Sequence, residues 1–338
     1  MMRDYISQIE QGENLSHDEI TLVMELIMSG RASLEEIKQF LLALNEKGPT
    51  VEEITASALI MRKFVTPVVT NHEIILDVVG TGGDHKNTFN ISTVTAIVVA
   101  ACGVVVAKHG NRRVSSRCGS ADVLEALGIN VNIEEKYLGE ALNSIGLAFL
   151  YAQRLHPAMK NVAPARQELG VRTIFNILGP LTNPAQATHQ VMGVYSRDLL
   201  EPMCQVLKNL GLKRALVVHG NDGLDEITTT DKTFVSEFTG QEIISYDIDP
   251  VELGFPVARI EDLSGGDVPE NANIVLNILE GGMGPKRDIV VLNAAYALYT
   301  TGTVKNLKEG IHMAAHAIDS KLAIEKLEEL EEFTNRVR

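Results

Sequence analysis

Cysteine is scarce in this chain: among 338 residues only Cys102, Cys118 and Cys204 occur. These positions are too far apart for a CxxC metal or redox pair, and an odd number argues against a disulfide framework. The sequence therefore predicts buried or incidental thiols. A content of 45% hydrophobic residues is enough for a large apolar core, in one large domain or two unequal ones.

Long hydrophobic runs are also missing. The longest ones cover residues 97–102 and 104–107 and stay far below the roughly 20 residues that a membrane span requires. The N-terminal residues include Asp4 and Glu10 and contain no apolar stretch flanked by small residues, which does not fit a signal peptide. We therefore expect a soluble cytoplasmic protein that makes no membrane contact.

Basic residues are in the minority: 30 lysines and arginines face 44 acidic residues, for a formal net charge of -14. This charge disfavours general affinity for nucleic acid or for anionic membranes, because such binding needs a broad basic surface. An anionic small ligand would have to meet a local basic patch. Residues 108–117 supply one, with Lys108, Arg112, Arg113 and Arg117 and no acidic residue.

The first 65 residues contain three capping-box patterns, each followed by helical apolar spacing. The pairs are Ser16 with Glu19, Ser33 with Glu36, and Thr50 with Glu53. The second segment has more apolar surface than three short helices can cover, in a stripe of Leu34, Ile37, Phe40, Leu41 and Leu44. This pattern predicts a small helical domain with a partner surface, such as a dimer interface.

Beyond Pro67, short β-branched runs alternate with longer helical stretches, which is typical of a mainly parallel central sheet flanked by helices. The predicted strands cover residues 74–79, 104–107, 147–151, 190–195 and 215–219. In such an α/β domain, ligands bind beyond the carboxyl ends of the strands. Residues 323–336 are highly charged and predict a solvated surface helix.

A glycine-rich segment, Gly80-Thr81-Gly82-Gly83-Asp84, follows the first predicted strand and precedes a helix that should start near Ser92. Three glycines let backbone N–H groups approach an oxyanion, and the helix N-terminus adds a positive dipole. A purely structural turn is equally compatible with the loop alone. His85 stands where a dinucleotide fingerprint or a Walker A motif needs another residue, so neither motif fits.

Hydroxyl and amide side chains are concentrated where that helix begins, in Thr88-Phe89-Asn90-Ile91-Ser92-Thr93. Helix capping by Asn90 or Ser92 would explain one of these residues but not the set, which favours ligand contact. A further segment, residues 108–120, again lies between a strand and a helix. Its basic, glycine and serine residues suit a phosphate or pyrophosphate, although a bare charged run is more often a solvated loop.

Two adjacent carboxylates, Asp225-Glu226, follow the last predicted strand through a glycine turn and are suited to bind magnesium, although most such pairs are surface charge. Arg166 could hold a carboxylate bidentately, although a helical arginine is more often a surface residue. A second glycine-rich basic loop, residues 281–287, follows no clear strand and is interpreted as a turn that leads into a helix.

Taken together, residues 80–84, 88–93, 108–111, 119–128 and 225–226 closely resemble the anthranilate phosphoribosyltransferase family of tryptophan biosynthesis. The resemblance covers nearly the whole chain. It implies a homodimer through a small helical domain, residues 1–70, joined by a helical segment near residues 165–185. It also implies a larger α/β domain, residues 71–338, with the nucleoside phosphorylase-like glycosyltransferase fold.

The resemblance also implies sites for phosphoribosyl pyrophosphate (PRPP), anthranilate and a pair of Mg²⁺ ions in each subunit. PRPP would be held by Gly80, Thr81, Gly82, Gly83, Asp84, Thr88, Asn90, Ile91, Ser92, Thr93, Lys108, His109, Gly110, Asn111, Arg112, Arg113, Val114, Ser115, Ser116 and Ser120. Anthranilate would be held by Gly80, Asn111 and Arg166, with His109, His156 and Gly179 along its route. The metal ligands would be Ser92, Asp225 and Glu226, and the residues that carry catalysis Lys108, Asn111, Asp225 and Glu226. Arg113 and Cys118 depart from the family pattern, which has a small residue and usually serine there.

Two other functions are compatible with the sequence. One is a pyrimidine nucleoside phosphorylase-like enzyme, which would share the fold, and the other is a non-enzymatic paralogue that binds nucleic acid. The paired acids and the region of Arg166 favour the transferase over the phosphorylase, and the net charge of -14 weighs against nucleic acid. The common phosphoribosyltransferases, which have two acids followed by a threonine-rich loop, do not match.

Overall fold

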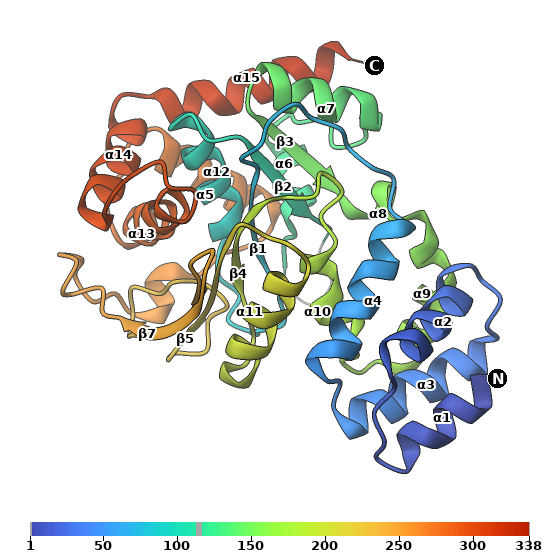
Figure 1. The fold of residues 1–338 in the computed structure, drawn as a ribbon. Helices are drawn as coiled ribbons and strands as arrows, with labels where there is room; N and C mark the ends of the chain where they lie inside the picture. Colours follow the sequence, from blue (N-terminus) through green and yellow to red (C-terminus); the bar gives the residue numbers. More distant parts are fainter. Residues whose placement is uncertain (1, 113–116, 338) are drawn as a thin grey trace.

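The computed structural model describes residues 2–112 and 117–337 and has two lobes (Figure 1). The small lobe contains the N-terminal helices α1 (Met2–Glu10), α2 (His17–Met28), α3 (Leu34–Lys47) and α4 (Val51–Lys63). The large lobe is built on a seven-stranded sheet flanked by helices. The predicted fold class, a small helical domain and a larger α/β domain with a mainly parallel sheet, is confirmed.

The three predicted capping boxes are present and begin α2, α3 and α4. The last one does more than cap its own helix. Glu53 is completely buried, and its carboxylate accepts the backbone N–H of Leu15 at 3.0 Å and that of Thr50 at 2.7 Å. Lys47, at the end of α3, forms an ion pair with the same carboxylate at 2.9 Å. One buried charge pair therefore joins three helix ends of the small lobe.

The sheet has the strand order β3-β2-β1-β4-β5-β6-β7. The strands are β1 (Leu76–Gly80), β2 (Val106–Gly110), β3 (Leu147–Tyr151), β4 (His189–Gly193), β5 (Arg214–Gly220), β6 (Thr233–Phe238) and β7 (Ile243–Ile248). β1 to β5 are the predicted strands and run parallel, whereas β6 and β7 are antiparallel and were not predicted. The chain order reverses between β1 and β4, which is where such sheets bind ligands.

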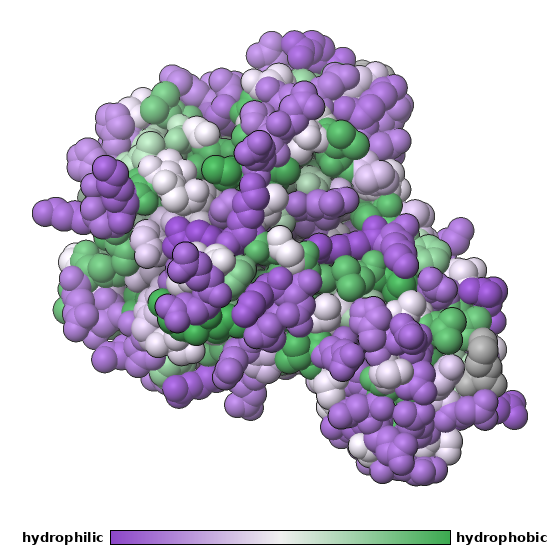
Figure 2. Space-filling model, in the orientation of Figure 1, coloured by the Kyte–Doolittle hydropathy of each residue, from purple (hydrophilic) through white to green (hydrophobic). Residues whose placement is uncertain are grey.

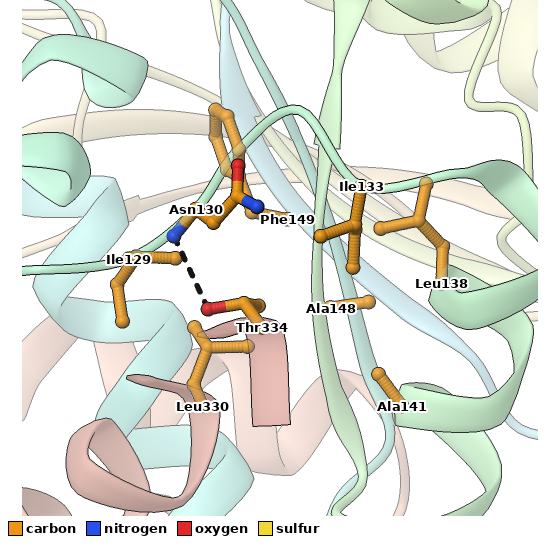
Figure 3. Close-up of a pocket in the computed structure, with 9 residues that line it drawn as sticks. All are labelled: Ile129, Asn130, Ile133, Leu138, Ala141, Ala148, Phe149, Leu330 and Thr334. Carbon is orange, nitrogen blue, oxygen red and sulfur yellow. Dashed lines mark hydrogen bonds between the residues drawn. The ribbon is translucent and has the colours of Figure 1, made fainter. Parts of the chain in front are cut away.

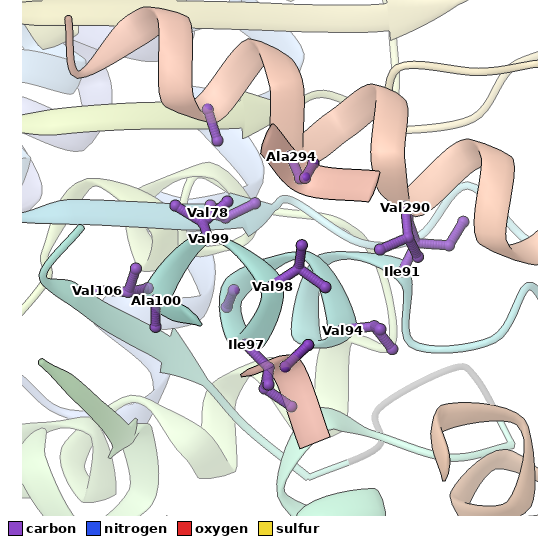
Figure 4. Close-up of a cluster of buried hydrophobic side chains, with 14 of the residues drawn as sticks. Val78, Ile91, Val94, Ile97, Val98, Val99, Ala100, Val106, Val290 and Ala294 are labelled. Atoms are coloured by element: carbon purple, nitrogen blue, oxygen red, sulfur yellow. The ribbon is translucent and has the colours of Figure 1, made fainter. Parts of the chain in front are cut away.

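The helices of the large lobe surround this sheet. They are α5 (Ile91–Ala101), α6 (Ser120–Ala126), α7 (Glu135–Ser144), α11 (Leu200–Asn209), α12 (Val268–Leu279), α13 (Pro285–Thr300), α14 (Leu307–Asp319) and α15 (Leu322–Arg336), with the 3-10 turns η2 (Gly179–Leu181), η3 (Arg197–Leu199) and η4 (Ile260–Leu263). Figure 4 shows Val98 of α5 in one apolar cluster with Val78 of β1 and Val290 of α13. This packing holds the N-terminus of α5, with Ser92, near the end of β1. Within residues 2–112 and 117–337, no helix is long and apolar enough to cross a membrane.

After β3 the chain returns to the small lobe through α8 (Ala152–Leu155), η1 (Pro157–Asn161), α9 (Ala163–Leu169) and α10 (Phe175–Leu178). Val162 and Ala165 belong to the same buried cluster as Ile27 and Phe40 of the N-terminal helices. Figure 2 shows hydrophobic side chains along the junction between the lobes. The small lobe is therefore made of two stretches of chain, and the second one carries Arg166. A domain boundary at residue 70 stays a prediction.

The C-terminal helix α15 is only half solvated. Leu327, Leu330 and Phe333 are buried. Figure 3 shows Leu330 and Thr334 beside Asn130, whose backbone N–H donates to Thr334 Oγ1 at 3.2 Å. The expectation of a solvated helix was wrong for this face, because apolar residues recur at helical spacing among the charges. The short helix α1 was not predicted.

Replacing Lys47 by Met tests the buried charge pair of the small lobe. The substitution leaves the Glu53 carboxylate buried without a cation, so we expect the free energy of unfolding to fall by about 3 kcal/mol in urea denaturation. Lys136→Met is the control, because Lys136 pairs with Glu134 on the exposed surface, where solvent screens the pair, and its loss should change the stability little. Equal stability of the two variants would contradict this account.

Candidate active site

Glycines end the two strands that meet at the reversal of strand order, Gly80 on β1 and Gly193 on β4, and Gly110 ends the neighbouring β2. A Cβ on Gly193 would lie 1.6 Å from the backbone oxygen of Asp225, and one on Gly80 would lie 2.4 Å from Asp225 Oδ2. A side chain at residue 193 would clash with backbone, and one at residue 80 would displace the Asp225 carboxylate. The segment that follows β5 therefore lies directly against the ends of β1 and β4.

Polar contacts hold this segment in place. Asn293 of α13 accepts the N–H of Ile227 at 3.1 Å and donates to the Ile227 carbonyl at 2.8 Å. On the other side, Asp222 accepts the N–H of Leu224 at 3.0 Å. The predicted metal ligands Asp225 and Glu226 lie between these two anchors, which limits the positions that their carboxylates can reach.

Asp225 and Glu226 form an acidic cluster with Asp84 of the glycine loop. Burial and the charge of Asp84 raise the pKa of Asp225 to about 7. Burial and the charge of Asp225 raise the pKa of Glu226 well above its usual range, although its carboxylate accepts the backbone N–H of Ser92. Three carboxyl groups lie close together, and two of them have raised pKa values. A divalent cation bound here would reduce the repulsion between their ionised forms.

The donor types of this cluster fit a hard divalent cation such as Mg²⁺, because carboxylate and hydroxyl oxygens are its preferred ligands. Among the residues that the structure describes, no three His, Cys, Asp or Glu side chains are arranged to hold a metal ion by themselves. Further ligands would have to come from Ser92 and from the oxygens of a bound phosphate. This requirement matches the way Mg²⁺ is usually held, by few carboxylates together with substrate phosphates.

The glycine loop, residues 80–84, already binds an anionic group. The N–H of Gly82 donates to Asp225 Oδ2 at 2.7 Å, so this amide is directed at a negative charge. Thr81 is used differently, because its N–H donates to the Gly193 carbonyl at 2.9 Å and its hydroxyl accepts the N–H of Tyr195 at 3.0 Å. Thr81 therefore ties the loop to the end of β4, while Gly82 directs its amide at an anion.

Lys108 lies buried on β2 beside the acidic cluster. Burial lowers its pKa, while Asp77 and the carboxylates of the cluster act to raise it. Asp77 is completely buried on β1, where it accepts the backbone N–H of His109 at 3.1 Å and the amide of Asn183 at 2.8 Å. Burial raises the pKa of Asp77 to about 6. No role was predicted from the sequence for Asp77 or Asn183. An acidic residue within an otherwise apolar strand was the sequence feature that could have pointed to Asp77.

Asn111 and Ser120 are hydrogen-bonded to each other within residues 108–120, the second segment predicted to bind phosphate. The N–H of Asn111 donates to Ser120 Oγ at 3.1 Å, and the Ser120 hydroxyl donates to the Asn111 carbonyl at 3.1 Å. The amide of Asn90 donates to the Cys118 carbonyl at 3.2 Å, which joins this segment to the start of α5. The predicted contacts Arg113, Val114, Ser115 and Ser116 lie outside the described residues.

Several predicted PRPP contacts are engaged elsewhere. The Arg112 guanidinium forms a bidentate pair with Glu125 of α6, at 2.6 and 2.7 Å, and would have to leave it to reach a phosphate. The side chains of Ile91 and Thr93 are buried in α5, and their backbone N–H groups donate to the carbonyls of Phe89 at 2.7 Å and Asn90 at 3.1 Å. Thr88 forms a β-bridge with Ser264.

His109 and His156 form a buried pair whose Nε2 atoms are 3.0 Å apart. The other ring nitrogen of His109 donates to the backbone of Gly179, so His156 is the donor within the pair. Burial lowers the pKa of His156 to about 4, and burial together with His156 lowers the pKa of His109 well below its ordinary value. Both rings are therefore neutral near pH 7, and these three predicted residues lie together.

Arg166 lies half-buried on α9, with its guanidinium 6.0 Å from the centre of the Phe175 ring. Burial lowers its pKa. Among the residues that the structure describes, no carboxylate forms an ion pair with Arg166 and no atom accepts a hydrogen bond from its side chain. A partly desolvated cation of this kind is suited to bind an anionic ligand.

Comparison with known proteins decides the family. The profile of the glycosyl transferase family, a/b domain, matches residues 72–324, and that of the glycosyl transferase family, helical bundle domain, matches residues 3–65. The anthranilate phosphoribosyltransferase of Acetivibrio thermocellus is 51% identical over 335 residues, which cover 99% of this chain and 97% of that protein. The chain belongs to the anthranilate phosphoribosyltransferase family.

Solved structures of anthranilate phosphoribosyltransferases have the same fold. The enzyme from Thermus thermophilus matches with a TM-score of 0.93 at 43% identity, over 98% of this chain and 99% of that one. The enzyme from Saccharomyces cerevisiae in complex with PRPP and Mg matches with a TM-score of 0.92 at 26% identity, over 99% and 98%. The same enzyme in complex with 4-fluoroanthranilate matches with a TM-score of 0.90. The resemblance is confirmed, and neither alternative function is supported.

The buried histidine pair predicts a pH dependence of stability. The native His156 pKa of about 4 lies below the ordinary value of 6.5, so the unfolded chain binds a proton between these pH values that the native protein does not. Stability should therefore fall as the pH drops from 7 to 4. We expect wild type to lose about 3 kcal/mol more over this range than His156→Gln in urea denaturation.

His72→Gln is the matched control, because His72 lies exposed on the surface. This variant should lose as much stability between pH 7 and pH 4 as wild type does. If His156→Gln also follows the wild-type pH profile, His156 is not held neutral by burial.

Proposed function

We propose that this chain transfers the 5-phosphoribosyl group from PRPP to the amine of anthranilate, giving N-(5-phosphoribosyl)anthranilate and pyrophosphate, a step of tryptophan biosynthesis. The observation that carries the proposal is the convergence of the glycine loop, Lys108 and the acidic cluster at one edge of the sheet. This arrangement occurs in a chain that matches anthranilate phosphoribosyltransferases over nearly its full length.

The phosphate groups of PRPP would lie between the glycine loop and the segment closed by Asn111 and Ser120. Both segments contain backbone N–H groups and hydroxyls, and Asn90 joins the second one to the start of α5. Lys108 is the buried cation beside them and would stabilise the charge that develops on the departing pyrophosphate. The other residues of these two segments that were predicted from the sequence to bind PRPP are proposed to contact it as well.

Mg²⁺ would be held by Ser92, Asp225, Glu226 and phosphate oxygens. When bound, the metal supplies Lewis-acid stabilisation of the leaving pyrophosphate, commonly worth several kcal/mol. The carboxylates of the acidic cluster would then lie next to a cation rather than next to each other. A pair of ions in each subunit is part of the proposal.

The reaction does not require a nucleophilic side chain. The aromatic amine is already unprotonated at neutral pH and attacks C1 of the ribosyl ring as the bond to pyrophosphate breaks. Positive charge develops on the ring, and positioning with electrostatic stabilisation supplies most of the catalysis. Anthranilate would be positioned by its carboxylate on Arg166, with Asn111, Gly80 and the neutral pair of His109 and His156 nearby.

The chain would act as a homodimer through the small lobe, in the cytoplasm. Leu34 and Leu42 of α3 and Leu22 of α2 are exposed, which leaves apolar surface on this lobe for a second copy to cover. These parts of the proposal rest on the exposed side chains, on composition and on the family pattern.

Loss of anthranilate fluorescence is the direct test of the activity. We expect the loss to require both substrates and Mg²⁺ and to stop when a chelator is added. A variant with Asp225→Asn and Glu226→Gln keeps the shape of the cluster but not its charge, so it should lose activity and metal dependence together. A folded wild-type protein without turnover, or a double variant that magnesium still stimulates, would contradict the proposal.

Arg166→Ala tests the position of anthranilate. We expect the KM for anthranilate to rise by about tenfold or more, because a hydrogen bond to a charged group contributes about 1.5 to 3 kcal/mol. The KM for PRPP should change little. Arg154→Ala is the control, since Arg154 is exposed on α8 and should leave both constants unchanged. Equal rises in both KM values for Arg166→Ala would exclude this role.

A further inference from the structure

Arg172 joins the small lobe to the glycine loop. It lies between α9 and α10, six positions after Arg166, in the stretch of chain that completes the small lobe. Its Nη2 donates to the Gly83 carbonyl at 2.6 Å and lies 3.2 Å from Nε2 of His85. Its guanidinium also lies 4.2 Å from the centre of the Tyr195 ring, just beyond β4. One exposed side chain thus contacts both the loop and the sheet edge.

The loop that Arg172 contacts has an unusual backbone. Gly82 and Gly83 have φ values of 65° and 78°, and the non-glycine residues His85 and Asn87 have φ values of 58° and 54°. Left-handed conformations are unfavourable for residues with a Cβ and persist only where surrounding contacts hold them. The contacts from Arg172 to Gly83 and His85 are suited to hold this conformation.

The direction of the Gly83 carbonyl determines the direction of a backbone donor. In a planar trans peptide the C=O and the following N–H point in opposite directions. Because the Gly83 carbonyl is directed at Arg172, the N–H of Asp84 is directed away from it. The Asp84 carboxylate is part of the acidic cluster with Asp225 and Glu226. Turning this peptide would therefore displace both the Asp84 amide and a carboxylate of the cluster.

We propose that Arg172 is a positioning residue for pyrophosphate binding: it holds the Gly83–Asp84 peptide so that the glycine loop presents its amides to the phosphate groups. The inference rests on the proposed function and deepens it, because Arg172 itself contacts the loop and not the reacting atoms. Lysine cannot replace it, since the planar guanidinium both donates in a fixed direction and stacks on Tyr195.

Arg172→Met removes the hydrogen bonds and the charge while keeping a long apolar side chain. We expect the KM for PRPP to rise about tenfold, with a smaller change in the KM for anthranilate and an unchanged unfolding midpoint. The KM of Arg172→Lys for PRPP should also be well above the wild-type value. Arg197→Met is the matched control, because Arg197 is also exposed and lies 3.6 Å from the centre of the Phe234 ring, but does not contact the loop.

Two further measurements separate positioning from a general structural effect. Guanidinium chloride at a non-denaturing concentration should partly restore the KM for PRPP in Arg172→Ala, and the same concentration of NaCl should not. Calorimetric titration with magnesium pyrophosphate should show about tenfold weaker binding to Arg172→Met than to wild type. The titration needs no turnover, so it tests the inference even if wild type fails the anthranilate assay, which would overturn only the proposed function.

The inference is overturned if Arg172→Met binds pyrophosphate as tightly as wild type, or if Arg172→Lys has a wild-type KM for PRPP. It is also overturned if both KM values rise equally as the unfolding midpoint falls, since that pattern indicates a damaged fold. Rescue by guanidinium together with weakened pyrophosphate binding supports it.

Discussion

The close approach of the Asp225 segment to the ends of β1 and β4 is the constraint on which the site depends. The backbone of Asp225 lies against Gly193 at the end of β4, and its carboxylate lies against Gly80 at the end of β1, so neither glycine leaves room for a Cβ. Asn293, on α13, fixes the other end of this segment through two hydrogen bonds to the backbone of Ile227. As a result, carboxylates from the loop after β5 lie within hydrogen-bonding distance of the glycine loop after β1.

This close approach has an electrostatic consequence. Three acidic side chains share a small space, and two of them have raised pKa values. Lys108 supplies one positive charge, and it is itself buried close to the completely buried Asp77. The raised pKa values mean that the carboxyl groups of Asp225 and Glu226 hold protons at a pH where isolated carboxyl groups are ionised, and a bound divalent cation would favour their ionised forms. The anionic pyrophosphate can then be bound through the metal, Lys108 and backbone amides.

Sequence patterns found the main parts of the fold because those parts are local. Capping boxes depend on residues three positions apart, and the parallel strands are short β-branched runs, so both could be predicted from the sequence. β7 was missed because most of its residues are exposed or half-buried. β6 was missed because Ser236 and Glu237 interrupt its apolar residues, although the structure buries both. The buried face of α15 was overlooked because charged residues dominate its composition.

The sequence by itself determined which chemical groups are available: a glycine loop after a strand, a basic segment and an acidic pair, in the order that identifies the family. Only the tertiary structure decided how each group is used. Arg112 is paired with Glu125, Arg172 holds Gly83, and Asp77 lies close to Lys108. These pairings join residues that are distant in the chain or compete for the same partner. They depend on distances and burial that arise only when the two lobes and the sheet edge come together.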